Sequence, residues 1–112
     1  MGIGIELHSA RPRRLDPAHT RATLLRASHE HGEGLARVLH ELPLDRGWRL
    51  WRIDPYDHTF FDQREAAAAL GEIDRLLALC VDEEQRAAAV DLERMLGACA
   101  ATSGGWLWFV GD

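Results

Sequence analysis

The stretch WLWFV, residues 106–110, decides how this chain can fold, because it is apolar on both faces of an extended backbone. A strand of that kind has to be covered on both sides or paired in the interior of a sheet. Two glycines precede it and end the helical pattern before them. We therefore predict a strand near 105–110, paired centrally.

The expected partner of that strand is the segment WRLWRI, residues 48–53. It is rich in residues that favour strands, and bulky side chains occur at both odd and even positions. We predict an inner strand near 47–53 that pairs with the strand near 105–110. Trp48 and Trp51 would lie on opposite faces of it, and one of them is expected to be exposed, whereas Trp106 and Trp108 share a face.

The amino-terminal region adds strand signals of a different type. Ile3, Ile5 and Leu7 alternate with small or polar residues, which predicts an edge or near-edge strand near 2–8. Residues 18–30 fit two interpretations. An Asp-Pro pair before them can cap a helix, yet the same segment can form a strand near 22–28, which we favour.

Three segments have helical periodicity: residues 34–42, 62–80 and 82–100. Asp62 and Asp82 each stand at a position typical of a helix cap, and the two longer helices are expected to form a hairpin. With few strands and no regular strand–helix–strand alternation, the pattern predicts an α+β fold: a small mixed or antiparallel sheet packed by helices. At 112 residues, the chain is expected to form a single domain over 1–112.

Charge is unevenly distributed along the chain. Residues 1–52 hold nine arginines against six acidic residues, and residues 53–112 hold four against twelve, so the net charges are +3 and −8 and sum to −5. Phosphate binding needs clustered positive charge, so no nucleic-acid partner is expected, although Arg11, Arg13 and Arg14 can contact an anion. No apolar run is long enough to span a membrane, and we expect a cytoplasmic protein without a cofactor.

The densest group of polar side chains lies between the predicted inner strand and the helix at 62. Asp54, Asp57, His58 and Asp62 can supply oxygen and imidazole ligands to a divalent metal, or a carboxylate–imidazole pair for acid–base chemistry. The alternative is purely structural: a turn at Asp54, a helix cap at Asp62 and solvated side chains between them. A second imidazole pair, His29 with His31, lacks the further ligands that zinc usually requires.

Two short motifs resemble a widespread family of small uncharacterised bacterial proteins. That family has an Ile-Asp-Pro-Tyr-Gly-Asp-Thr-x-Phe-Asn-like turn before a helix and a final strand that closes with Gly-Asp. The turn corresponds to residues 53–62 and the final strand to 107–112, where Asp57, His58 and Asp62 replace the glycine, aspartate and asparagine of the pattern. The resemblance implies a stand-alone protein of the kind found beside polymorphic toxins, and it does not imply an enzyme.

Three functions fit these observations. The first is a partner-binding protein of the immunity type, which neutralises a toxin through an acidic surface. Its expected contacts are Trp48 or Trp51 as an aromatic anchor, Asp54, Tyr56, Asp57 and His58 in the loop, and the acidic residues Asp74, Asp82, Glu83, Glu84, Asp91 and Glu93. The alternatives are a metal-dependent hydrolase or transferase that uses the 54–62 loop, and a small-ligand regulator.

Overall fold

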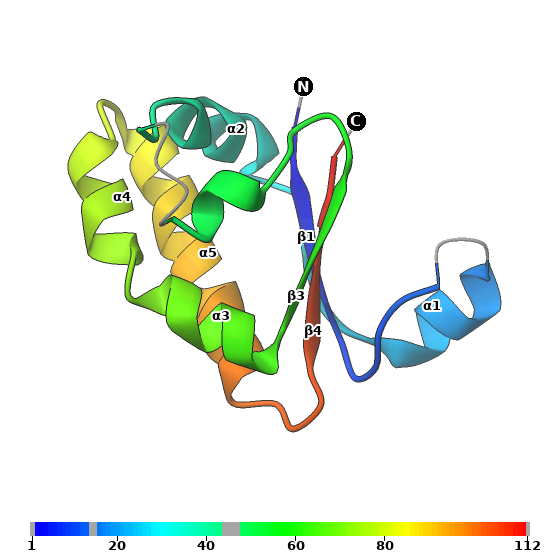
Figure 1. The fold of residues 1–112 in the computed structure, drawn as a ribbon. Helices are drawn as coiled ribbons and strands as arrows, with labels where there is room; N and C mark the ends of the chain where they lie inside the picture. Colours follow the sequence, from blue (N-terminus) through cyan, green and yellow to red (C-terminus); the bar gives the residue numbers. More distant parts are fainter. Residues whose placement is uncertain (1, 14–15, 44–47, 112) are drawn as a thin grey trace.

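The structure is a computed structural model that describes residues 2–13, 16–43 and 48–111. It is an α+β fold, drawn in Figure 1. The elements are, in chain order, β1 (Gly4–His8), α1 (Pro17–Thr23), β2 (Leu24–Ser28), α2 (Gly32–His40), the 3-10 helix η1 (Leu50–Arg52), β3 (His58–Asp62), α3 (Gln63–Leu70), α4 (Ile73–Leu79), α5 (Glu83–Ala100) and β4 (Trp106–Val110).

The four strands form one antiparallel sheet in the order β2-β1-β4-β3. Helices α2 to α5 cover one side of this sheet, and α1 lies on the other side near one end (Figure 1). The long helix α5 packs against α2, α3, α4 and β1, so it forms the centre of the helical layer. The core is the set of apolar side chains between that layer and the sheet.

The carboxyl-terminal stretch is a central strand, as predicted, but its partners differ from the prediction. β4 pairs with β1 on one side and with β3 on the other, and not with residues 48–53. β1 lies next to the edge strand β2, which is the near-edge position that was one of the two expected for it. With a neighbouring strand on each side, the backbone N–H and C=O groups of β4 can form hydrogen bonds within the sheet, as a strand that is apolar on both faces requires.

The predicted strand near 47–53 is wrong over its described residues. Trp48, Leu50 and Ile53 are the buried ones, a spacing of two and then three that fits a tight helical turn better than a strand. The carboxylate of Glu72 accepts hydrogen bonds from the backbone N–H groups of Arg49 and Leu50 and so stabilises η1. Residues 44–47, and with them the start of the predicted strand, lie outside the described residues.

The strand that the sequence analysis missed is β3, inside the segment interpreted as a polar loop. Its sequence HTFFD does alternate: Thr59 and Phe61 are buried, while His58, Phe60 and Asp62 are partly exposed. Threonine and phenylalanine both favour strands. Only residues 54–57 of the predicted loop are irregular, and their turn ends where β3 begins.

Both interpretations of residues 18–30 are realised, one after the other. Asp16 caps α1 by accepting a hydrogen bond from His19 N at 3.0 Å, and the chain then continues as β2. The predicted strand near 22–28 is thus confirmed from residue 24 onward. The short helix expected at 34–42 begins two residues earlier and ends two residues earlier, as α2.

The helical hairpin is confirmed, with one break. The segment 62–80 divides into α3 and α4 at Gly71 and Glu72, because glycine is a poor helix former and the Glu72 side chain turns away to cap η1. Asp62 makes the predicted capping box with Glu65. In α5 the predicted apolar side is buried, and burial raises the pKa of the Cys99 thiol to about 11.

No helix of the described residues is both long enough and apolar enough to cross a membrane.

Candidate functional site: an aromatic groove on the open face of the sheet

Successive residues of a strand point to opposite faces, so the register of the sheet determines which side chains share a face. On the face opposite α2–α5, β1, β4 and β3 contribute three cross-strand rows, and we call this surface the open face. The rows are Gly4 with Val110 and His58, Glu6 with Trp108 and Phe60, and His8 with Trp106 and Asp62. The open-face residues of β3 and β4 are partly exposed, whereas Phe61, Leu107 and Phe109 on the covered face are fully buried.

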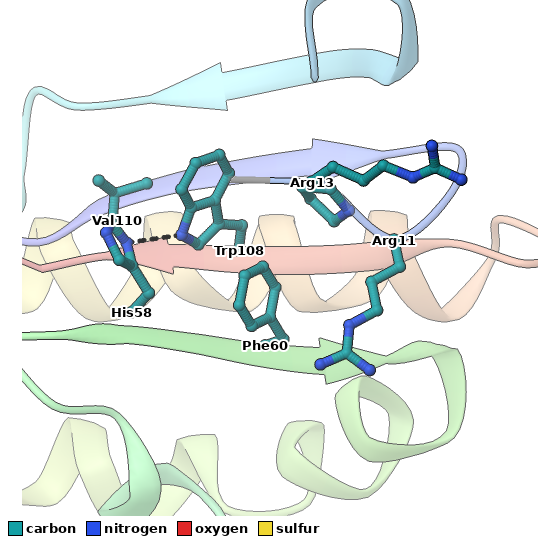
Figure 2. Close-up of a pocket in the computed structure, with 7 residues that line it drawn as sticks. Arg11, Arg13, His58, Phe60, Trp108 and Val110 are labelled. Atoms are coloured by element: carbon teal, nitrogen blue, oxygen red, sulfur yellow. Dashed lines mark hydrogen bonds between the residues drawn. The ribbon is translucent and has the colours of Figure 1, made fainter. Parts of the chain in front are cut away.

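A groove of about 750 Å³ runs over the open face between β3, β4 and the loop that follows β1. We call it the aromatic groove; it is lined by Arg11, Pro12, Arg13, His58, Phe60, Trp108 and Val110. Figure 2 shows the side chains of His58, Trp108 and Phe60 side by side over the sheet, with Arg11 and Arg13 at one end. Rings therefore form the floor of the groove, and Arg11 and Arg13 line its end, with the Arg13 guanidinium turned away from the rings in Figure 2.

The floor is held in place by contacts among its own rings. Phe60 and Trp108 are stacked at 24° with centroids 5.8 Å apart, and His58 lies 5.1 Å from Trp108. The indole Nε1–H of Trp108 donates a hydrogen bond to Nδ1 of His58 at 2.8 Å (Figure 2). Because an indole nitrogen only donates, Nδ1 accepts, and the proton of the neutral imidazole is on Nε2.

Arg11 lies over two of the open-face rings. Its Cζ atom is 5.1 Å from the centroid of Trp106 and 5.5 Å from that of Phe60, which is the geometry of a cation–π contact. Neither Arg11 nor Arg13 forms an ion pair with a carboxylate of the described residues, and both side chains are exposed. Among the described residues, these two positive charges at the end of the groove thus have no carboxylate paired with them.

The end of the groove nearest α1 is anchored by a buried histidine. His8 is completely buried; its Nδ1 is 2.9 Å from Thr23 Oγ1 and its Nε2 is 2.9 Å from Glu6 Oε1. The Thr23 hydroxyl also donates to the carbonyl of His19, within α1. Since His8 and Thr23 are both buried, this network is not accessible to a substrate, and it serves to hold α1 against β1.

The predicted loop site lies at the margin of the aromatic groove. His58 lines the groove, and Asp54 and Asp57 line an adjoining hollow of about 380 Å³ that Arg11 and Phe60 also border. The two carboxylates accept hydrogen bonds from the backbone N–H groups of Tyr56 and His58, as expected for turn residues. Among the described residues, no group of three or more His, Cys, Asp or Glu side chains is placed to hold a metal ion.

The predicted aromatic contacts are dispersed. Trp48 is buried under Arg75, whose Cζ is 5.5 Å from the indole centroid, while Trp51 is 42% exposed on the side of η1. One exposed tryptophan of the pair was predicted, and this is confirmed, although the strand assumed for it was wrong. Tyr56 is 66% exposed and borders a separate hollow beside α2.

The predicted acidic contacts are on the helical layer, and most of them already have partners in the chain. Arg37 of α2 donates to Asp82 at 2.8 Å and to Glu84 at 3.1 Å, and the hydrogen bond from Arg37 lowers the pKa of Asp82. The remaining acidic contacts are Glu83, which pairs with Arg86; Asp91, which accepts from Ser28; and Asp74 and Glu93, which are exposed. The structure thus brings together two of the six acidic residues, around one arginine.

Sequence reasoning missed Phe60, Trp106 and Trp108 as a binding surface and regarded Arg11 and Arg13 as a weak anion contact only. The alternation of residues 106–110 did indicate that the two tryptophans share a face. Which face the helices cover follows from the packing of α2–α5 against the sheet, and the rows across β3 follow from a pairing that the sequence analysis did not predict.

The fold and the groove define a small α+β protein with one sheet face covered by α2–α5 and the other largely open. In comparisons with protein-family models, with curated proteins and with solved structures, no match was found. The resemblance of residues 53–62 and 107–112 to a bacterial family therefore stays a prediction.

Proposed function

We propose that this chain is a partner-binding protein that docks another protein on the open face of its sheet. The observation that carries the proposal is the open face itself: three partly exposed aromatic rings in adjacent rows, with Arg11 over two of them. Tryptophan and arginine are the residues most enriched where binding energy concentrates in protein interfaces. Contiguous exposed apolar surface on a small protein is typical of an interaction site.

The immunity-type function is the concrete form of this proposal: the chain would neutralise a toxin by covering a surface that the toxin needs. The acidic residues of the helical layer support such docking less than the sequence suggested. Asp82 and Glu84 share Arg37, whose single positive charge offsets one of the two carboxylates, and such ion pairs within the chain reduce the field available to steer a basic partner. Docking through the acidic helices remains the competing prediction.

Co-expression with the product of a neighbouring gene tests the proposal. We expect the intact chain to relieve the toxicity of that product, and Trp106→Ala to lose the relief while the protein stays folded. Trp51→Ala is the matched control, because it removes an exposed tryptophan away from the open face.

Two results would contradict the proposal in different ways. Relief that survives Trp106→Ala but is lost in Glu83→Arg would place docking on the acidic helices. If the intact chain relieves the toxicity of no neighbouring gene product, the immunity-type function is wrong.

A further inference from the structure

We propose that the aromatic groove binds an acidic side chain of the partner protein, presented next to an aromatic or other flat apolar side chain. This inference rests on the proposed function, because it names the chemistry of the group that docks on the open face. It also reverses the expected charge of the contact. An acidic surface would select a basic partner, whereas this groove selects a carboxylate.

The first argument is the floor of the groove. The rings of Phe60 and Trp108 are nearly parallel, with 24° between their planes, and the hydrogen bond from Trp108 to His58 fixes the orientation of the indole. Aromatic faces of this kind stack best on another flat group, at centroid distances of about 4.5–7 Å. A planar side chain therefore gains more from this floor than a branched aliphatic one.

The second argument is the positive charge at the end of the floor. Arg11 is oriented by its contacts with Phe60 and Trp106, so its planar donors are partly pre-organised for a carboxylate. Arg13 lines the same end of the groove, and among the described residues neither arginine has an ion pair. Charge complementarity then favours an anion on the partner, and a desolvated guanidinium–carboxylate contact is among the stronger hydrogen-bonded contacts in proteins.

The third argument comes from the neighbouring charges. Asp54 and Asp57 lie in the adjoining hollow, which Arg11 and Phe60 also border, and Arg52 there is already paired with Glu65. These carboxylates repel an extended polyanion that would run across both hollows. A single carboxylate confined to the end with Arg11 and Arg13 avoids them, so a peptide side chain fits the charges better than a nucleic acid.

Blocked dipeptides are the probes for this chemistry. Acetyl-aspartyl-tryptophan amide carries the carboxylate and the ring, acetyl-asparaginyl-tryptophan amide lacks the charge, and acetyl-aspartyl-alanine amide lacks the ring. The indole N–H resonance of Trp108 in the intact protein reports binding, because that group lies in the floor of the groove. Adenosine monophosphate, a planar ring with a phosphate, tests whether the natural occupant is a nucleotide.

We expect the aspartyl-tryptophan peptide to shift the Trp108 indole signal saturably, and each of the other two peptides to bind about tenfold more weakly. Arg13→Gln and Arg11→Gln are expected to remove the preference for aspartate over asparagine. Arg26→Gln is the matched control: Arg26 is also exposed, but it lies on β2 in register with Leu7 of the covered face. Phe60→Ala is expected to remove the preference for the ring.

Equal binding of the aspartyl and asparaginyl peptides, or no shift with any peptide, would overturn the inference. Tighter binding of adenosine monophosphate than of the aspartyl-tryptophan peptide would also overturn it, in favour of a nucleotide. These failures are distinct from failure of the proposed function. If the peptides do not bind and Trp106→Ala still abolishes relief of toxicity, the open face docks a partner by other chemistry. If the peptides bind but Trp106→Ala leaves relief of toxicity unchanged, the docking proposal is wrong.

Discussion

Phe60 and Phe61 are consecutive residues of β3 with opposite surroundings. Phe61 is fully buried between the sheet and the helices and meets Phe109 edge-on at 5.1 Å, whereas Phe60 is partly exposed and stacks on Trp108 on the open face. The same contrast holds for Leu107 and Trp108 in β4. One face of the sheet is a core, and the other is a surface built from equally large aromatic side chains.

This contrast shows that a strand position can hold a bulky apolar residue for two different reasons, folding or binding. On the covered face, burial explains the residues, because a core side chain is stabilised by the area it removes from water. On the open face burial is incomplete, and polar residues would serve a solvated surface of an antiparallel sheet equally well. The aromatic rings and Arg11 there are better explained by binding than by folding. The first of the four predictions below tests this difference directly; the other three test contacts that hold the sheet and the helical layer in place, in order of decreasing expected effect.

Phe61→Ala should lower the free energy of unfolding by about 3–5 kcal/mol, since it empties a fully buried site. Phe60→Ala should cost only about 1 kcal/mol, the value of a cross-strand pair on a partly exposed face. Denaturant unfolding of both variants measures the difference. Equal losses would mean that the open face is part of the core.

Gly111→Ala should destabilise the fold by about 1–3 kcal/mol, because a Cβ there would collide with the backbone of Asp54 and Asp57. This glycine lets the turn before β3 pack on the end of β4, next to His58. Gly97→Ala in α5 is the control: its Cβ would meet no atom within 4 Å, and the change should stabilise the helix by about 0.5–1 kcal/mol. Thermal unfolding measures both, and a stabilised Gly111→Ala would contradict the close approach.

Asp62→Ala should cost about 1 kcal/mol, because Asp62 closes the capping box where the chain passes from the sheet to the helical layer. Unfolding in denaturant measures the loss. Asp62→Asn keeps a capping side chain and should lose less. If the alanine and asparagine variants are equally stable, the cap contributes nothing to the junction.

The smallest effect concerns Asp82, whose pKa is lowered below its ordinary value of 3.8 chiefly by the hydrogen bond from Arg37. A lowered folded-state pKa means that the stabilisation is present above pH 3.8 and disappears as the pH falls through the folded-state value. Asp82→Asn should therefore be less stable than the wild type at neutral pH and approach it in acid. A stability gap that does not depend on pH would show that the pair with Arg37 contributes nothing.

The helical layer was the more predictable half of the fold, because its signals are local. The caps at Asp62 and Asp82 and the apolar side of α5 are all contained within one helix each. The break between α3 and α4 at Gly71 and Glu72 was not predicted, since it depends on a contact with η1, which is far away in the sequence.

The sheet was less predictable, because pairing is non-local. Residues 48–53 were predicted to pair with β4 and residues 58–62 to be a loop, although both segments are rich in β-formers; the partner of β4 is 58–62. Because of that wrong pairing, the residues that line the aromatic groove could not be predicted either. His58 was identified for its chemistry, but its place beside Trp108 follows from the register of β3 against β4, which only the folded sheet determines.

Side-chain oxidation by hydroxyl radicals, compared between the free chain and its complex with the partner, tests the central claim most directly. If the open face docks the partner, oxidation of Phe60, Trp106 and Trp108 slows in the complex, while Trp51 and Tyr56, which are more exposed and lie elsewhere, react at unchanged rates. Protection of Trp51 or Tyr56 with unchanged oxidation of the open-face rings would contradict the account.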